Sequence, residues 1–231
     1  MLSIRENLLK VQERIATAAA RAGRRADEIT LVGVSKTHPA IAIQEAFQAG
    51  VRHFGENRVQ EWEVKRVGTK NLDATWHLIG HLQSNKAARA AKLFHSVDSV
   101  DDFALAQKLD RARAEMGATE RLRVLIEVRV APEDTKSGVE IAALPELAQK
   151  VAALAHLELA GLMSIPPFLE AEVVRPYFRR LRELRDELRA QLGLPLGVLS
   201  MGMSHDFEVA IEEGATEVRV GTALFGMRQT K

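Results

Sequence analysis

The sequence predicts an α/β fold, a single (β/α)8 barrel of the TIM type with an extra helix at the N-terminus. Eight short apolar runs, rich in β-branched residues, alternate with longer segments of helical periodicity. The runs are almost continuously apolar, which is typical of parallel strands buried on both faces. With 231 residues the chain can close such a barrel as one domain spanning 1–231; an open doubly wound sheet is the alternative. The runs lie at 31–35, 51–55, 75–80, 93–97, 122–130, 157–165, 197–202 and 217–221.

An amphipathic helix precedes the first strand. Ser3 followed by Glu6 forms a capping box that starts this helix, and Gly23 ends it. Its apolar residues recur at helical spacing and predict a buried face made of Ile4, Leu8, Val11, Ile15 and Ala18.

Further helices are expected between the strands, at 40–50, 101–117, 144–155 and 173–193. The last of these contains an arginine-rich stretch, which raises the question of nucleic-acid binding. Glu183, Asp186 and Glu187 interleave with the arginines, while an apolar stripe from Val174 to Leu188 faces the core. A solvated helix face with ion pairs is therefore favoured over a nucleic-acid patch.

The composition excludes several classes of site and partner. The chain has no cysteine, which excludes disulfides, zinc thiolate sites, iron–sulfur clusters and a cysteine nucleophile. A net charge of +1 requires neither nucleic acid nor an anionic membrane as partner. Charges interrupt the N-terminal segment every few residues, so we expect no signal peptide, and no apolar run is long enough to cross a bilayer. We expect a cytoplasmic protein that is a monomer.

Lys36 is the foremost candidate for chemistry because it follows the run 31–35 directly. Active sites of such barrels form at the carboxyl ends of the strands. Burial beside the apolar barrel lowers the pKa of a lysine, so that more free amine can attack a carbonyl group. The alternative is a lysine whose stem lies along the rim and whose ammonium reaches water.

Two glycine- and hydroxyl-rich segments predict a phosphate site near the last two strands. Helix N-termini offer unpaired N–H groups and a positive dipole end to a phosphate, and barrels often place such a site there. The alternative is that these residues serve only as helix caps and turns. The segments comprise Ser200, Gly202 and Ser204, before a helix expected to start near His205, and Gly221 and Thr222, before the last helical turn.

No metal site is expected. His77 and His81 are four residues apart, but they lie on an expected strand and no HExxH motif is present. The polar loop 134–138 is interpreted as a turn rather than an anion contact.

Beyond these single features, the sequence closely resembles the pyridoxal phosphate homeostasis proteins, the YggS/PROSC family. The matching segments run in family order across nearly the whole chain. They are LVGVSKTHP (31–39), FGENRVQE (54–61), WHLIGHLQSNK (76–86), KSG (136–138), GLMSIPP (161–167) and the long segment 199–226.

The resemblance implies a single barrel domain like the N-terminal domain of alanine racemase, with pyridoxal 5'-phosphate (PLP) bound as a Schiff base on Lys36. It implies that the other cofactor-binding residues are Ser200, Ser204, Gly221 and Thr222 at the phosphate, Arg219 at the pyridine nitrogen, and Asn57 and Met203 at the ring.

An arginine at the pyridine nitrogen implies weak catalysis, because a guanidinium cannot give up its proton to the ring, which is then a poor electron sink. The only tyrosine, Tyr177, lies on a helix expected outside the barrel, so we expect no opposite-face acid of the kind racemases use. The resemblance therefore indicates a protein that binds PLP, supplies it to PLP-dependent apoenzymes and has no substantial turnover of its own. The alternatives are an amino-acid racemase-like PLP enzyme and a Schiff-base aldolase.

Overall fold

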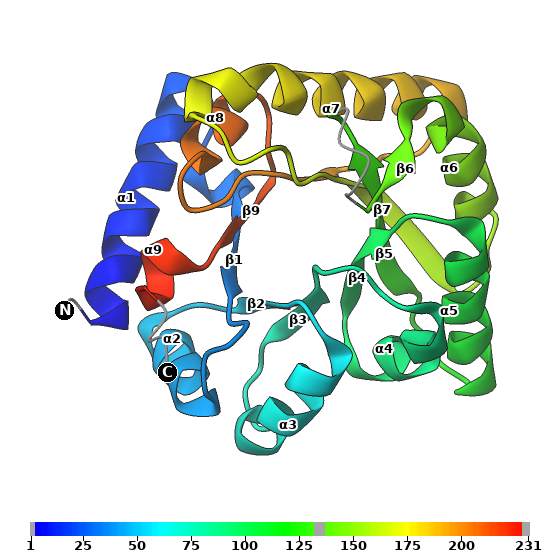
Figure 1. Cartoon of the computed structure of the whole chain (residues 1–231), viewed down its shortest axis with the longest axis horizontal. Helices are drawn as coiled ribbons and strands as arrows, with labels where there is room; N and C mark the ends of the chain where they lie inside the picture. Colours follow the sequence, from blue (N-terminus) through cyan, green and yellow to red (C-terminus); the bar gives the residue numbers. More distant parts are fainter. Residues whose placement is uncertain (1–2, 132–136, 228–231) are drawn as a thin grey trace.

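The eight predicted apolar runs form a closed parallel barrel. The computed structural model describes residues 3–131 and 137–227. The strands lie in the order β4-β3-β2-β1-β9-β8-β7-β5, and β4 pairs with β5 to close the ring, which excludes the open doubly wound sheet (Figure 1). Their bounds are β1 (Thr30–Val34), β2 (His53–Glu56), β3 (Thr75–Leu78), β4 (Ser96–Val100), β5 (Leu122–Arg129), β7 (Leu157–Met163), β8 (Val198–Ser200) and β9 (Glu217–Val220).

One additional strand, β6 (Val139–Glu140), extends the end of β5, with Val139 opposite Val128. The sequence did not predict β6, because two residues are too short to show a period. It follows the loop 134–138, for which a turn was predicted. Residues 134–136 of that loop, including Lys136 of the KSG segment, lie outside the described residues.

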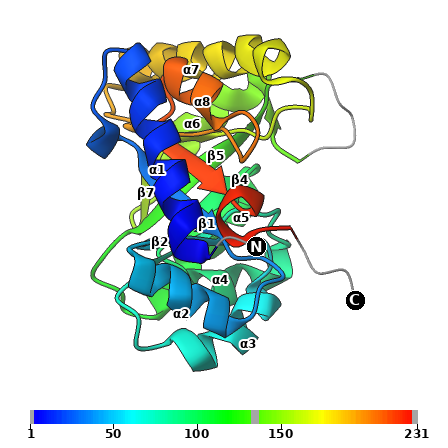
Figure 2. The same ribbon diagram turned by 90° about the vertical axis from the view of Figure 1, so that its left-hand side faces the viewer.

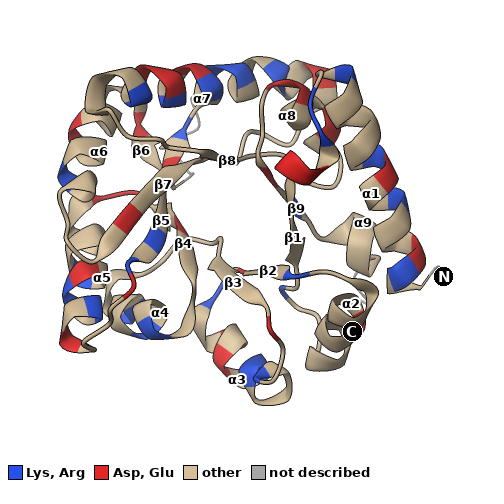
Figure 3. Cartoon of the chain, turned by 180° about the vertical axis from the view of Figure 1, so that it is seen from behind, with Lys and Arg blue, Asp and Glu red and all other residues tan. Residues whose placement is uncertain are grey.

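Helices surround the barrel, as Figure 1 shows, and both signs of charge are spread along the outer helices α5 and α7 (Figure 3). Among the described residues no helix is both long enough and apolar enough to span a membrane. The helices are α1 (Ile4–Arg21), α2 (Ala40–Ala49), α3 (Val59–Thr69), α4 (Ala87–Leu93), α5 (Phe103–Glu115), α6 (Leu144–Ala152), α7 (Ala171–Leu192), α8 (Phe207–Glu212) and α9 (Thr222–Phe225).

Helix α1 is the predicted N-terminal addition. Its capping box is present: the Glu6 amide donates to Ser3 Oγ over 3.2 Å, and the Ser3 amide donates to Glu6 Oε2 over 2.7 Å. Gly23, at φ +67°, lies just beyond its end. The predicted apolar face is buried except for the partly buried Ile4, and it packs on α2, α8 and α9 along the outside of the barrel (Figure 2).

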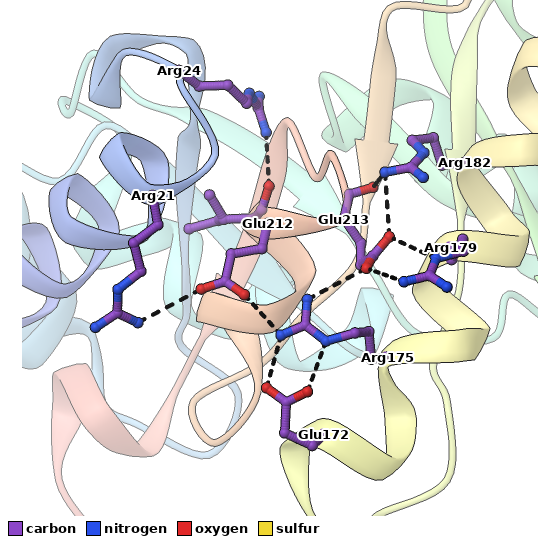
Figure 4. Close-up of polar contacts among 9 residues, drawn as sticks. Arg21, Arg24, Glu172, Arg175, Arg179, Arg182, Glu212 and Glu213 are labelled. Atoms are coloured by element: carbon purple, nitrogen blue, oxygen red, sulfur yellow. Dashed lines mark hydrogen bonds and ion pairs between the residues drawn. The ribbon is translucent and has the colours of Figure 1, made fainter.

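The arginine-rich helix α7 is bound to the end of α8 by ion pairs (Figure 4). Glu213, only 5% exposed, lies 3.3 Å from Arg175, 2.9 Å from Arg179 and 3.2 Å from Arg182. Burial alone would raise the pKa of Glu213, but the arginines outweigh it and lower that pKa. The arginines therefore stabilise the packing of two helices, which the sequence did not predict. The ion pairs predicted within the helix are present between Arg180 and both Glu183 and Glu187.

Candidate functional site

A cavity of about 720 Å³ opens at the carboxyl ends of the barrel strands. Its walls come from the loops after β1, β2, β3, β7, β8 and β9, so residues far apart in the sequence meet there. Seven of the eight predicted cofactor-binding residues line this cavity; Ser200 does not. The seven are Lys36, Asn57, Met203, Ser204, Arg219, Gly221 and Thr222.

The backbone on the N-terminal side of Lys36 is fixed by contacts of Ser35, the first residue after β1. The Ser35 hydroxyl donates to Glu56 Oε1 over 2.6 Å, and Lys65 Nζ donates to the Ser35 carbonyl over 2.7 Å. Lys65 also lies 2.9 Å from Glu56, and both side chains are buried. Burial raises the pKa of the Glu56 carboxyl, an effect that Lys65 and Ser35 partly offset. This buried pair fixes the backbone from which the Lys36 side chain extends.

The residue on the other side of Lys36 is fixed as well. Thr37 has φ +67°, a left-handed conformation that is uncommon for a residue with a side chain. Its amide donates to Glu61 on α3, and Glu61 lies 2.7 Å from Lys65. Burial would raise the pKa of Glu61, but the hydrogen bonds from Lys65 and Thr37 outweigh it and lower that pKa. Helix α3 therefore supports both neighbours of Lys36.

Arg219 extends from β9 into the barrel and is only 3% exposed. Its Nη1 donates to Ser200 Oγ over 2.7 Å and its Nη2 donates to the Ser164 carbonyl over 2.8 Å. Burial lowers the pKa of Arg219, and nearby carboxylates, Glu217 foremost, oppose that shift. Both of these acceptors are neutral, so these two contacts orient the guanidinium without neutralising its charge. Ser200, which is predicted to contact the phosphate, accepts a hydrogen bond from Arg219 and does not line the cavity.

The segment after β8 turns sharply before α8. Gly202 has φ +92°, and a side chain there would place its Cβ 2.9 Å from Phe207 Cα, so only glycine fits. The Met203 amide donates to Asp206 Oδ1 over 2.6 Å, which closes a turn at 204–206. This turn is the reason that α8 begins at Phe207, two residues after the predicted start at His205.

Ser204 lies against the start of α9. Its Oγ accepts a hydrogen bond from the Ala223 amide over 3.2 Å. Gly221 is the N-cap of α9 and makes no side-chain cap, and Ser204, Gly221, Thr222 and Ala223 all line the cavity at the start of this helix. Hydroxyl groups and amide donors gathered in this way are suited to oxygen atoms of an anion.

Several cavity residues were not singled out from the sequence. Phe168 is 80% exposed, and its ring centroid lies 4.4 Å from that of His205. His81 lies 3.3 Å from Asp101. Most of these residues lie in or beside the segments 76–86, 161–167 and 199–226, which resemble the family. This resemblance was the one feature of the sequence that could have indicated them. Gly80 and His81 were expected only as residues at a strand end, and the residues missed are Val34, Ile79, Ile165, Phe168, His205 and Ala223.

An ionic cluster centred on the buried His77, Asp98 and Glu217 lies in the barrel below Arg219. His77 Nδ1 lies 3.0 Å from Asp98, and Arg123 lies 2.9 Å from Glu217. Burial would lower the pKa of His77, but Asp98 and Glu217 outweigh it and raise that pKa. The pKa of His53, whose ring is 3.0 Å from His77, falls to about 4 because of burial and the charge of His77. The carboxylates of this cluster are balanced by His77 and Arg123.

Comparison with known proteins identifies relatives over the full length. The family model of the alanine racemase N-terminal domain matches residues 7–229. Pyridoxal phosphate homeostasis proteins of Aquifex aeolicus and Pseudomonas aeruginosa are 48% and 47% identical, over 97% and 99% of this chain and 98% and 97% of theirs.

Solved structures that are similar to this chain include a protein with PLP bound and alanine racemases. PipY of Synechococcus elongatus PCC7942, in a structure with PLP bound, is 42% identical with a TM-score of 0.82, covering 92% of this chain and 100% of PipY. An alanine racemase of Clostridium difficile, complexed with cycloserine, has a TM-score of 0.75 at 15% identity, covering 99% of this chain and 60% of the racemase. The racemase likeness shows a shared barrel fold alone.

Proposed function

The chain belongs to the pyridoxal phosphate homeostasis protein family, and from this membership we propose that its barrel-mouth cavity binds PLP through Lys36. PLP homeostasis is its function. One observation supports the assignment to this cavity. The amine of Lys36, the buried guanidinium of Arg219 and the start of α9 all line it. We expect the protein to store PLP and to supply it to PLP-dependent apoenzymes.

The donor set fits each part of PLP. Lys36 offers a primary amine for a Schiff base with the aldehyde. Ser204, Gly221 and Thr222 offer hydroxyl and amide groups for the phosphate, and Ser200 contributes by orienting Arg219. Asn57 and Met203 form walls that suit an aromatic ring.

Arg219 favours storage over catalysis. When bound, PLP supplies a reactive aldehyde and, if its ring nitrogen is protonated, an electron sink. A guanidinium at that nitrogen donates a hydrogen bond and keeps its own proton. Arg219 therefore holds the ring without protonating it, which supports a protein without substantial turnover.

The racemase-like alternative needs a second acid on the opposite face of the substrate. Tyr177, the only tyrosine, lies on α7 and is partly buried against the core outside the barrel. It is not among the residues that line the cavity. We propose in addition that residues 1–231 act as one monomeric, cytoplasmic PLP-binding unit that needs neither nucleic acid nor a membrane.

A visible absorption spectrum tests the proposal. The purified protein incubated with PLP should absorb in the visible range, and borohydride should remove that band by reducing the link to Lys36. A protein that remains colourless would contradict the proposal and favour the aldolase alternative.

A further inference from the structure

A second cavity, of about 550 Å³, lies beside the cofactor cavity, between the loops that follow β2 and β3. The two cavities share Asn57, Gly80 and His81 as walls. Gly80 makes this arrangement possible, because a Cβ there would lie 2.5 Å from the Asn57 carbonyl oxygen. The remaining walls come from the segments 54–61 and 76–86, whose other polar residues have no part in the proposed PLP site.

Arg58 and Lys86 give the second cavity its charge. No aspartate or glutamate is among its lining residues. Within residues 3–131 and 137–227, neither Arg58 nor Lys86 has a side-chain hydrogen bond or ion pair, whereas many other arginines pair with carboxylates, those of α7 among them. The nearby carboxylate of Glu61 is already bound by Lys65 and Thr37. Arg58 is near enough to Glu61 to help lower the pKa of that carboxyl, but Glu61 does not line the cavity, so the two cations give the cavity a positive charge that attracts an anion.

Further donors converge on the same cavity. Gln60 and Gln83 line it and can each donate from an amide group. Arg58 is also the N-cap residue of α3 and makes no side-chain cap, so the first amides of an eleven-residue helix remain available. A planar guanidinium, an ammonium and amide donors together suit the three oxygens of a phosphate group better than a single carboxylate.

We propose that this second cavity binds the phosphate group of a phosphorylated small molecule, next to the cofactor and separate from it. The proposal goes beyond PLP homeostasis, because it needs neither Lys36 nor the donors near α9. Arg58 and Lys86 provide the charge, and Gln60 and Gln83 provide the neutral donors.

The test uses full-length protein loaded with PLP and reduced with borohydride, so that the first phosphate site is filled. Inorganic phosphate is titrated by calorimetry at constant ionic strength, with acetate in a parallel titration. We expect saturable phosphate binding that Arg58→Gln or Lys86→Gln weakens about tenfold each, the loss of one charge-assisted hydrogen bond. Arg111→Gln and Lys108→Gln, on the exposed face of α5, are the matched controls and should leave binding unchanged.

Absence of saturable binding would overturn the proposal, as would equal weakening by the α5 controls. Acetate binding as tight as phosphate would replace the phosphate assignment with a carboxylate site. If the protein did not take up PLP, phosphate would be titrated into the unloaded protein. Saturable binding that Arg58→Gln and Lys86→Gln both weaken would still support the second site, and binding that neither variant weakens would overturn it. The second site and the proposed PLP function can therefore fail independently.

Discussion

At the residue scale, the two serines that are predicted to contact the phosphate also make other contacts in the structure. Ser204 accepts from the Ala223 amide, whereas Ser200 accepts from Arg219. The sequence predicted that both serines contact the phosphate, because their spacing shows only that each lies near the end of the same strand. Which way a hydroxyl points depends on its neighbours in space, here β9 for Ser200 and α9 for Ser204.

Ser204→Ala should weaken PLP binding by about 1.5–3 kcal/mol, the cost of one charge-assisted hydrogen bond. Pyridoxal, which has no phosphate, should lose much less affinity, so it is the control ligand. Dissociation constants from absorbance titrations of both ligands measure the difference. Equal losses for PLP and pyridoxal would place Ser204 away from the phosphate.

Lys65→Met should destabilise the protein by about 3–5 kcal/mol, because it leaves the buried Glu56 carboxylate without its partner. It should also weaken PLP binding, since Lys65 supports the backbone on both sides of Lys36. Urea denaturation gives the free energy of unfolding, and Lys70→Met, at the exposed C-cap residue of the same helix, is the control. Stability equal to that of the control would show that the pair does not support the Lys36 loop.

At the element scale, sequence periodicity located all eight barrel strands and the main helices, because buried parallel strands are apolar throughout. It did not reveal β6, which has two residues, or the true start of α8, which a turn closed by Asp206 delays. The attachment of α7 to α8 was also invisible, since the arginines and Glu213 lie more than thirty residues apart.

Glu213→Gln should lower the free energy of unfolding by about 1 kcal/mol at neutral pH, the scale expected of a partly exposed ion-pair network. Since the folded pKa of Glu213 is lowered from its ordinary value of 4.5, its contribution is present above pH 4.5 and is lost as the pH falls through the folded pKa. Denaturation curves of wild type and variant should therefore converge in acid. Glu187→Gln, on the exposed face of α7, is the control, and a difference that persisted in acid would contradict the ion-pair account.

At the scale of the whole molecule, barrel closure brings six strand ends to one cavity, and the ionic cluster below Arg219 occupies the interior. The resemblance to known proteins supplied the identity of the cofactor; spacing alone supplied only a lysine at a strand end and a plausible anion site. The second cationic cavity could not be foreseen, because it exists only where the loops after β2 and β3 meet.

We expect no substantial racemase, transaminase or decarboxylase turnover from the PLP-loaded protein. One positioned acid or base contributes about 10²–10⁴-fold to a rate, and the described cavity has no tyrosine to serve as the opposite-face acid. Incubation with L-amino acids in deuterated water, followed by NMR and chiral chromatography, should show at most slow α-proton exchange. Turnover of any amino acid at about 1–10³ s⁻¹ would contradict the storage proposal and favour an enzymatic function.

The central claim is that Lys36 is the residue that binds PLP covalently. Borohydride reduction of the PLP-loaded protein, followed by proteolysis and mass spectrometry, identifies the modified lysine directly. We expect the pyridoxyl group on Lys36 and its loss from the Lys36→Ala variant. A pyridoxyl group found mainly on Lys86 or Lys136 in the wild-type protein would contradict the account.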